Sequence, residues 1–411
     1  MSPTGKSAGV VIAGAGQGGF QVAASLRTEG YQGSITLIGD EPGRPYQRPP
    51  LSKAFMAGKL DVEATHLRPE AFYQDQRINL MMGQRIARIE PSNHRVLLAS
   101  GGQVPYRQLV LATGARNRRL PVPGAGLEGV CYLRTRDEAI DIRQRLGDAQ
   151  NIVIIGGGFI GLELAAVASS LGKHVMVVEF KERLMSRVVA PIISEFYREL
   201  HLSHGIAFAL GVKTQEISSR GNRVSEVVLS DGGIYPADLV VVGIGVVPNT
   251  ELAEGCDLAV ADGIVVDDHM RTGNQDIYAI GDCALHPNRF AGGPVRIESV
   301  QNSVDQARCV AASIVGRPHS YAAVPWFWTD QFDIKFQMVG LSQGCDAAVT
   351  RGIPESKKFS VLYFKHNRLV AIDSINRPAD HMAGRKLLTS GTSLTPEQAA
   401  DPSVDLKSLA A

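Results

Sequence analysis

The sequence predicts an α/β protein with two Rossmann-like domains and a C-terminal α+β domain. Three observations support this prediction. A glycine loop of the form G-x-G-x-x-G occurs twice, each loop is followed at a similar distance by a second matched segment, and the pattern changes after Pro325. The shared order of loop and segment indicates one duplicated unit.

The first glycine loop lies in VVIAGAGQGGFQVAASL, residues 10–26. An apolar run precedes Gly14, Gly16 and Gly19, and a helical pattern of small residues follows them, which is the context that this motif requires. The next expected strand, SITLIGDE, ends at Asp40 and Glu41, 21 and 22 residues after Gly19. We therefore expect a strand, loop and helix with an acidic residue at the end of the second strand.

The second glycine loop repeats this design in IVIIGGGFIGLELAAVA, residues 152–168. Gly156, Gly158 and Gly161 follow an apolar run, and the strand HVMVVEF carries Glu179, 18 residues after Gly161. The matched segments that follow the two copies are VLLASGGQVPYRQLVLATG (96–114) and VVLSDGGIYPADLVVVGIG (227–245). Each is expected to form a strand, a glycine turn, a second strand and a third strand that ends in glycine.

The two loops predict two bound dinucleotides. Glycines let the backbone approach a pyrophosphate, the helix N-terminus offers N–H groups and the positive end of its dipole, and the acidic side chain accepts hydrogen bonds from ribose hydroxyls. Glu179 would repel a 2′-phosphate and so favours NADH over NADPH, although Lys181 and Arg183 close behind it would weaken that preference. A protein with two such sites most simply carries FAD beside NADH.

Later blocks support FAD and set the domain boundaries. In DIYAIGDCA (276–284), an apolar strand ending at Gly281 and Asp282 can place a carboxylate against the hydroxyls of a ribityl chain. After Pro325, PWFWTDQ holds both tryptophans, QFDIKFQMVG alternates, FSVLYFKHNRLVAIDSIN reads as a hairpin, and a helix is expected over 378–388. We expect an FAD-binding domain over 1–115 and 246–324, an NAD-binding domain over 116–245 and a C-terminal domain over 325–411.

Composition excludes several other classes of protein. The 411 residues include 42 Lys and Arg against 41 Asp and Glu, and this net charge of +1 argues against a nucleic-acid partner. The longest apolar stretch, 239–247, is far shorter than the ~20 residues of a membrane-spanning helix, so no membrane insertion is expected.

The five scattered cysteines form neither a disulfide framework nor a C-x-x-C pair, which fits a reducing cytoplasm. His201 and His204 are spaced i, i+3 without a carboxylate or cysteine to complete a ligand set, so no metal is expected.

Longer motifs carry a more specific resemblance. RPYQRPPLSK (44–53), LVLATGARNRRLP (109–121), RIESVQN (296–302) and PWFWTDQ (325–331), together with both glycine loops, resemble the FAD-dependent NADH:ferredoxin reductases of the putidaredoxin reductase and biphenyl-type dioxygenase reductase kind, from about residue 9 to the C-terminus. The resemblance implies a glutathione-reductase-like fold, one non-covalent FAD, NADH as electron donor and a [2Fe-2S] ferredoxin as acceptor. That ferredoxin would serve a cytochrome P450 or a ring-hydroxylating dioxygenase. It would be acidic and dock transiently on a reductase that is a monomer or weak dimer.

The resemblance also implies roles for individual residues. Lys53 alone reads as an ordinary surface lysine, but the resemblance places its ammonium near flavin N5, where it would stabilise the charge left by hydride transfer. Glu163, expected on the first turn of the second Rossmann helix, would pair with Lys53 near the nicotinamide. Trp328 would lie beside the isoalloxazine ring, with Trp326 and Phe327 as competing candidates. Lys53, Glu163 and Trp328 are thus expected to position the cofactors, because hydride transfer requires no proton-abstracting dyad.

The remaining candidates are assigned to one cofactor or the other. Arg48 and Arg134 would bind the flavin or its phosphates, Asp282 and Val300 would line the ribityl chain and the ring end, and Ile86 would meet the adenine. The residues expected around FAD are Gly14, Gly16, Gly18, Gly19, Asp40, Glu41, Arg48, Lys53, Ile86, Ala112, Thr113, Gly114, Arg134, Gly281, Asp282, Glu298, Val300 and Trp328. The residues expected around NAD are Gly156, Gly158, Ile160, Gly161, Glu163, Glu179 and Gly245.

Cysteine positions discriminate among enzymes with this fold. Disulfide reductases need two cysteines four residues apart near the flavin, and NADH oxidases and peroxidases need one there, but the region after Asp40 contains none. A rubredoxin reductase remains open because it differs only in its acceptor. A non-enzymatic flavin- and NADH-sensing protein that resembles apoptosis-inducing factor is the alternative from a different class.

Overall fold

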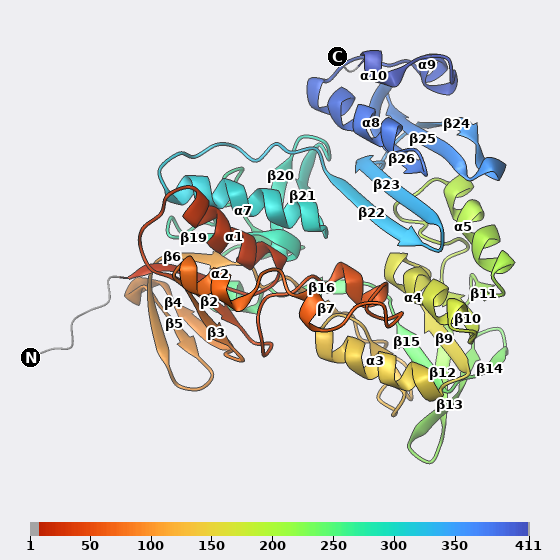
Figure 1. The fold of residues 1–411 in the computed structure, drawn as a ribbon, viewed down its shortest axis with the longest axis horizontal. Coiled ribbons are helices and arrows are strands. Elements are labelled where there is room, and N and C mark those ends of the chain that lie inside the picture. Colours follow the sequence, from red (N-terminus) through yellow and green to blue (C-terminus); the bar gives the residue numbers. More distant parts are fainter. Residues whose placement is uncertain (1–7, 410–411) are drawn as a thin grey trace, which may run out of the picture. The chain divides into compact units, whose positions relative to one another are not determined.

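The computed structural model describes residues 8–409, which divide into two compact units (Figure 1). Of the described residues, unit 1 holds 8–47, 66–116 and 248–326, and unit 2 holds 48–65, 117–247 and 327–409. Unit 1 contains the first glycine loop, and unit 2 contains the second loop and the C-terminal domain. The division of the chain by cofactor, into FAD-binding, NAD-binding and C-terminal domains, remains our prediction.

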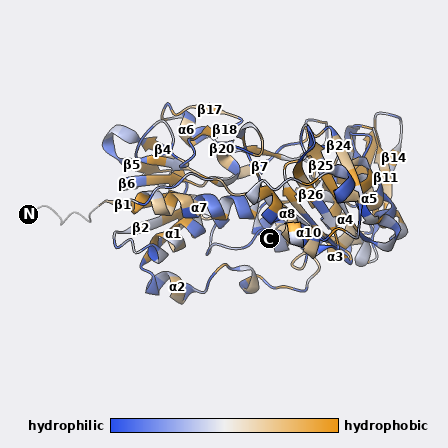
Figure 2. Cartoon of the chain, turned by 90° about the horizontal axis from the view of Figure 1, so that it is seen from above, coloured by the Kyte–Doolittle hydropathy of each residue, from blue (hydrophilic) through white to orange (hydrophobic). Residues whose placement is uncertain are grey.

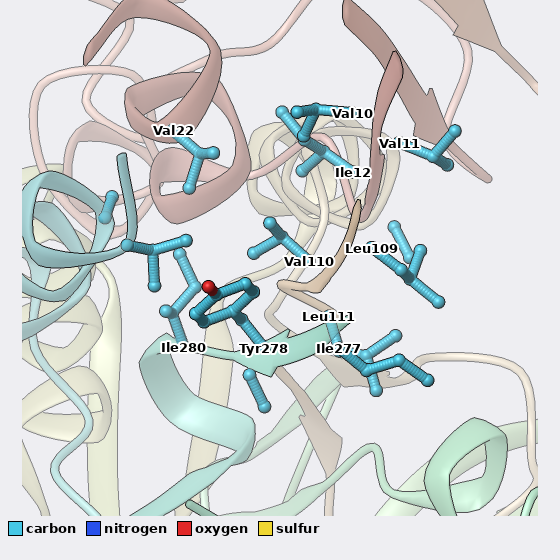
Figure 3. Close-up of a cluster of buried hydrophobic side chains, with 14 of the residues drawn as sticks. Val10, Val11, Ile12, Val22, Leu109, Val110, Leu111, Ile277, Tyr278 and Ile280 are labelled. Carbon is cyan, nitrogen blue, oxygen red and sulfur yellow. The ribbon is translucent and has the colours of Figure 1, made fainter. Parts of the chain in front are cut away.

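Unit 1 is built on a seven-stranded sheet of order β3-β2-β1-β6-β5-β4, in which β19 also pairs with β6. The pairs β1–β2, β1–β6, β2–β3 and β6–β19 are parallel, whereas β4 and β5 form an antiparallel extension. The strands are β1 (Gly9–Ala13), β2 (Ile35–Gly39), β3 (Ile78–Met82), β4 (Ile86–Glu90), β5 (Arg95–Leu98), β6 (Gln103–Leu111) and β19 (Ile277–Ala279). The parallel strands are short apolar runs because helices cover such sheets on both faces, and their side chains form the core of this unit (Figure 3).

Two long helices of unit 1, α1 (Gln17–Thr28) and α7 (Val300–Ile314), pack against each other. The smaller elements are a four-stranded sheet of β17 (Val260–Ala261), β18 (Gly263–Val265), β20 (Ala284–Asn288) and β21 (Gly293–Val295), with α2 (Glu70–Asp75), α6 (Glu251–Glu254), η3 (Pro91–Asn93) and η4 (Gly281–Cys283). Hydropathy colouring shows apolar residues along the strands of the sheet (Figure 2).

Unit 2 repeats the Rossmann-like design with strand order β11-β10-β9-β15-β8, all paired in parallel. The strands are β8 (Val130–Tyr132), β9 (Asn151–Ile155), β10 (His174–Glu179), β11 (Ala207–Leu210) and β15 (Leu239–Val242). The helices of this part are η1 (Pro49–Ser52), η2 (Glu63–Thr65), α3 (Arg136–Asp148), α4 (Phe159–Ser170) and α5 (Pro191–Ser203). A three-stranded antiparallel sheet joins β12 (Thr214–Arg220), β13 (Arg223–Leu229) and β14 (Ile234–Pro236), and the short strands β7 (Ala115–Asn117) and β16 (Val246–Pro248) lie where the chain passes between the units.

The matched segments after the two loops differ in one respect from the prediction. In the second copy the three expected strands form separately as β13, β14 and β15, whereas in the first copy the second and third strands are a single strand, β6. The first part of β6 pairs with β5, and the rest pairs with β1 and, at its end, with β19, so one unbroken strand has three neighbours. In the second copy β14 ends at Pro236, which has no N–H to donate to a ladder.

The C-terminal domain is a five-stranded sheet of order β22-β23-β26-β25-β24 with three helices. The elements are β22 (Trp326–Gln331), β23 (Ile334–Gly340), β24 (Ala347–Ile353), η5 (Pro354–Ser356), β25 (Lys358–Lys365), β26 (Arg368–Ile375), α8 (Pro378–Ser390), α9 (Pro396–Ala400) and α10 (Leu406–Leu409). The predicted hairpin is confirmed as β25 and β26, and the predicted helix is α8, two residues longer than expected. Within unit 2, apolar side chains of α5 and this sheet form one buried cluster that includes Tyr197, Phe336 and Phe359.

Candidate cofactor-binding and electron-transfer site

The first glycine loop is a turn that only small residues allow. Gly14 has φ +112°, and a Cβ there would lie 2.2 Å from the carbonyl oxygen of Ala112. A Cβ on Gly19 would lie 1.9 Å from the carbonyl oxygen of Gly14, so the helix must approach the strand this closely. A Cβ on Gly16, in contrast, would meet no heavy atom of the described chain within 4 Å. Two glycines are therefore needed by the protein itself, and the middle one leaves open space for a ligand.

The second loop has the same geometry. Gly156 has φ +114° and a Cβ there would lie 2.4 Å from the carbonyl oxygen of Gly243, while a Cβ on Gly161 would lie 2.1 Å from that of Gly156. Around Gly158, as around its counterpart in the first loop, no described atom lies within 4 Å of a Cβ. The sequence repeat is thus also a repeat of backbone conformation.

Both loops fit the pyrophosphate of a dinucleotide. Helices α1 and α4 begin directly after N-cap glycines, and within the described residues no side chain caps either helix and no acidic residue lies in either first turn. The N–H groups and the positive dipole ends at these helix starts are thus left for an anion. Each loop also lies where the strand order reverses, between β1 and β6 or between β9 and β15, which is where ligands bind to such sheets.

Most residues expected around FAD lie at one edge of the unit 1 sheet. Gly14, Asp40, Ala112 and Gly281 come shortly after the ends of β1, β2, β6 and β19, and the carboxyl ends of parallel strands meet at a common edge. Gly16, Gly18 and Gly19 start α1, and Thr113 and Gly114 follow Ala112. The structure therefore brings these candidates together as the sequence predicts for one dinucleotide.

The polar groups of this edge are ordered by hydrogen bonds within unit 1. The Thr113 hydroxyl donates to the Asn249 carbonyl at 2.7 Å, and the Gly281 N–H donates to Oε1 of Gln306 at 2.7 Å. Tyr46 donates its hydroxyl to Oε2 of Glu41 at 2.5 Å.

Four further candidates lie in unit 1: Asp282, Glu298, Val300 and Ile86. The Arg296 guanidinium pairs with Glu298 at 2.6 Å and donates to the Asp282 carbonyl at 3.2 Å. Val300 is the first residue of α7, after the Ser299 cap. Ile86 begins β4 and is buried in the core of the unit.

Arg48, Lys53, Arg134 and Trp328 lie in unit 2. Arg48 donates from Nη1 to the carbonyl oxygen of Arg134, so these two candidates are in contact. The segment that carries Lys53 begins with Pro49 and Pro50, which start the single turn η1 because their fixed φ suits the first helical positions. The Lys53 N–H closes this turn on the Pro50 carbonyl at 3.0 Å.

Lys53 and Glu163, 110 positions apart in the chain, form an ion pair. Nζ of Lys53 lies 2.7 Å from Oε1 of Glu163, whose side chain is only 4% exposed. The same oxygen accepts a hydrogen bond from the Thr329 hydroxyl at 2.6 Å, and Oε2 accepts one from Ser52 at 2.5 Å. A buried carboxylate is costly unless it is paired and hydrogen-bonded, and this one has an ammonium and two hydroxyls.

The position of Glu163 on its helix corrects the prediction. Helix α4 begins at Phe159, so Glu163 is its fifth residue and lies in the second turn rather than the first. The helix dipole stabilises carboxylates mainly in the first turn, so it contributes little at Glu163. Its environment is set instead by side chains from η1 and β22.

Glu179 ends β10 beside the second glycine loop. Its Oε2 accepts the Gly157 N–H at 2.6 Å and its Oε1 accepts the Lys181 N–H at 2.8 Å, so backbone groups fix the carboxylate beside the loop. Phe180 is 53% exposed, and the ammonium groups of Lys181 and Lys213 lie 5.2 and 5.1 Å from its ring centre.

The Arg183 side chain is held by neutral groups that follow it in the chain. Its guanidinium donates at 2.8 Å to the Ser194 hydroxyl and to the carbonyls of Val189 and Ser186. Lys213, which the sequence analysis did not single out, is the second cation of this region together with Lys181.

Two other NAD candidates are Ile160, within the second loop, and Gly245, two residues after Gly243, whose carbonyl oxygen faces Gly156. Ile160, the second residue of α4, is 42% exposed, which is unusual for an apolar side chain at a helix start. Gly245 has φ +100° and its carbonyl accepts the Arg118 N–H at 3.0 Å.

The three aromatic candidates, Trp326, Phe327 and Trp328, are consecutive residues of β22. Side chains alternate along a strand, and Thr329 points to Glu163 while Phe327 packs on Phe159 with ring centres 4.9 Å apart. Trp328 therefore lies on the other face of the strand. Its place beside the isoalloxazine remains our prediction.

The described residues contain no group of three His, Cys, Asp or Glu side chains placed to hold a metal ion, and none of their helices is long and apolar enough to cross a membrane. His201 is fully buried in α5 and bonds Gln331, and burial lowers its pKa to about 4. All five cysteines are free, and burial raises the pKa of Cys131 to about 12.

Four residues of the site were missed at the sequence level: Ser52, Lys213, Thr329 and Gln331. Ser52, Thr329 and Gln331 lie inside RPPLSK and PWFWTDQ, and the polar Thr329 and Gln331 at alternate positions of an aromatic strand were the available signal. Lys213 had no such signal, because it reaches Phe180 through pairing of β10 with β11.

Two protein families match the chain, the pyridine nucleotide-disulphide oxidoreductases over residues 8–307 and the reductase C-terminal family over residues 326–410. Rhodocoxin reductase from Rhodococcus erythropolis is 48% identical over 398 residues, which cover 97% of this chain and 93% of that protein. The ferredoxin reductase for the CYP199A2 system from Rhodopseudomonas palustris has a crystal structure that is 51% identical, covers 98% of this chain and 99% of its own, and gives a TM-score of 0.96. The covalent putidaredoxin reductase–putidaredoxin complex is 40% identical over 98% of each chain, with a TM-score of 0.95. The chain belongs to the pyridine nucleotide-disulphide oxidoreductase family and is an FAD- and NAD(P)H-dependent oxidoreductase of the ferredoxin reductase type.

Proposed function

We propose that this enzyme passes electrons from NADH through FAD to a [2Fe-2S] ferredoxin. The observation that carries the proposal is the pair of glycine turns with matching backbone geometry, combined with a buried Lys53–Glu163 pair. Two dinucleotide sites on one chain suit transfer from a nicotinamide to a flavin. The absence of cysteine between Asp40 and Lys53 argues against an internal disulfide as acceptor, so the electrons must leave to another molecule.

FAD, when bound, would supply the capacity to take up a hydride and to release electrons singly, which is what a one-electron iron–sulfur acceptor requires. Lys53 provides a positive charge that stabilises the negative charge gained on hydride transfer. Glu163 holds the Lys53 ammonium in place by pairing with it. Trp328 presents an apolar ring on the face of β22 opposite Thr329 and is assigned to the isoalloxazine.

The preference for NADH over NADPH is assigned to Glu179. Its carboxylate, fixed by two backbone N–H groups, accepts from ribose hydroxyls and repels a 2′-phosphate. Lys181 and Lys213 lie next to it and weaken this repulsion, so we expect a preference for NADH rather than strict selection.

The ferredoxin is assigned as an acidic, transiently docking partner of a cytochrome P450 system. The name of the CYP199A2 system reductase and that of the putidaredoxin complex support a ferredoxin over a rubredoxin, and a P450 over a dioxygenase. The net charge of +1 means that attraction for an acidic partner must come from a local patch. We further propose a monomer or weak dimer in the cytoplasm, since the five free cysteines suit a reducing compartment.

The test is NADH-driven cytochrome c reduction by the FAD-loaded enzyme with a panel of purified [2Fe-2S] ferredoxins and one rubredoxin. Rapid reduction that requires a ferredoxin supports the proposal. Reduction with rubredoxin alone would reassign the acceptor. Slow NADH consumption with every acceptor, accompanied by a long-lived charge-transfer band, would favour the non-enzymatic sensing alternative.

A further inference from the structure

A buried chain of hydrogen bonds runs from α5 to the Glu163 carboxylate. Nε2 of His201 lies 2.8 Å from Oε1 of Gln331, Nε2 of Gln331 lies 3.3 Å from the Thr329 hydroxyl, and that hydroxyl lies 2.6 Å from Oε1 of Glu163. None of the four side chains is more than 4% exposed. All four belong to unit 2, where they join α5, β22 and α4.

The charge on Glu163 fixes the direction of every bond in this chain. An ionised carboxylate only accepts, so the single hydroxyl hydrogen of Thr329 must point to Glu163. The Thr329 oxygen then accepts from the amide NH₂ of Gln331, which turns the amide oxygen of Gln331 to His201. Since that oxygen also only accepts, the proton of the His201 ring must lie on Nε2.

The surroundings of His201 agree with this assignment. Its Nδ1 is buried and has no hydrogen-bond partner among the described residues, as expected for the nitrogen that carries no proton. Burial, the main cause, and the nearby His204 lower the pKa of His201 to about 4, so the ring is neutral at pH 7. The ring is fully buried and packs in a T-shaped arrangement with Phe332, with ring centres 5.2 Å apart.

We propose that Thr329, Gln331 and His201 are positioning residues for hydride transfer, because together they hold Glu163 in the orientation that places the Lys53 ammonium. Three bonds that all donate toward the carboxylate polarise one another and strengthen the last one. Thr329 and Lys53 share Oε1 of Glu163, at 2.6 and 2.7 Å, so the donor at the end of the chain directs the oxygen that binds the ammonium. This inference rests on the function proposed above for Lys53.

The first test compares Thr329→Val with Thr329→Ser in the FAD-loaded enzyme. Valine keeps the shape and removes the donor, so flavin reduction at saturating NADH should slow about tenfold while NADH affinity changes less than about twofold. Serine restores the hydroxyl and should restore the rate. Thr65→Val is the matched control, because Thr65 is also fully buried in unit 2 but donates to the Val62 carbonyl, which is not part of the hydrogen-bond chain to Glu163.

A wild-type rate in Thr329→Val would overturn the positioning role. So would failure of Thr329→Ser to recover the rate, or an equal loss in Thr65→Val, since each points to general loosening of the unit.

The second test examines the hydrogen-bond chain directly, without NADH or ferredoxin. In ¹⁵N NMR of histidine-labelled enzyme, assigned with His201→Phe, the His201 ring should carry its proton on Nε2, and Thr329→Val should shift that signal although Thr329 does not touch the ring. A proton on Nδ1, or an unmoved signal, would overturn the inferred direction. If NADH fails to reduce the wild-type flavin, the proposed function is wrong. The NMR result still decides whether the hydrogen-bond chain from His201 to Glu163 is present.

Discussion

Replacing Lys53 by methionine tests whether its charge acts on the flavin or only stabilises the fold. Methionine keeps an unbranched side chain and removes the ammonium, which leaves Glu163 buried with the hydroxyls of Ser52 and Thr329 as its remaining partners. Breaking a buried ion pair costs about 3–5 kcal/mol. Because Lys53 is 21% exposed and two hydroxyls still donate, we expect a loss of about 2 kcal/mol, seen as a lower urea midpoint of the FAD-loaded enzyme.

The double variant Lys53→Met/Glu163→Gln separates stability from rate. The amide removes the unpaired charge and should recover most of the lost urea midpoint. Flavin reduction, followed by anaerobic stopped-flow absorbance with NADH, should stay about 100-fold below wild type in both variants, because neither supplies a positive charge. A double variant that reduces its flavin at the wild-type rate would refute the role of the ammonium.

Three further predictions concern the NAD loop and the C-terminal sheet. Glu179→Gln should raise the ratio of kcat/KM for NADPH to kcat/KM for NADH about tenfold. Adding Lys213→Ala should reverse much of that increase. An unchanged ratio in steady-state kinetics would reject both assignments. Gly158→Ala should fold normally but bind NADH at least about tenfold more weakly in a fluorescence titration. Gly161→Ala should lower the thermal midpoint, because its Cβ would lie 2.1 Å from a carbonyl oxygen. Equal thermal midpoints of the two variants would contradict the loop geometry. Burial raises the pKa of Asp373 to about 7, so the folded state holds the carboxyl proton more tightly than the unfolded state does. The free energy of unfolding should therefore fall as pH rises from about 4 to about 7. Asp373→Asn should flatten that part of the curve of thermal midpoint against pH, and an unchanged curve would contradict the assignment.

The glycine loops were predictable because their requirements are local. The spacing of Gly14, Gly16 and Gly19 reflects one backbone turn, and the geometry of a missing Cβ explains each position. The single strand β6 was not predictable in the same way. Its continuity depends on pairing with β5 on one side and β1 on the other, which the residues of 103–111 alone do not reveal.

The ion pair of the site depends on contacts between distant segments. Spacing alone did not pair Lys53 with Glu163; that expectation came from the resemblance to ferredoxin reductases, and the structure confirms the contact. Neither source indicated that Ser52 and Thr329 bind the same carboxylate, because η1, α4 and β22 meet only in the folded unit. The bond of His201 to Gln331 is likewise a tertiary contact that the sequence does not reveal.

The central claim is that electrons travel from NADH through FAD to a [2Fe-2S] ferredoxin. The most direct measurement is an anaerobic titration of excess oxidised ferredoxin with NADH, in the presence of a catalytic amount of the FAD-loaded enzyme, followed by the visible absorbance of the iron–sulfur cluster. Because NADH gives two electrons and the cluster takes one, we predict two ferredoxins reduced per NADH, and no reduction when the enzyme is omitted. NADH oxidation that leaves the ferredoxin oxidised would contradict the account.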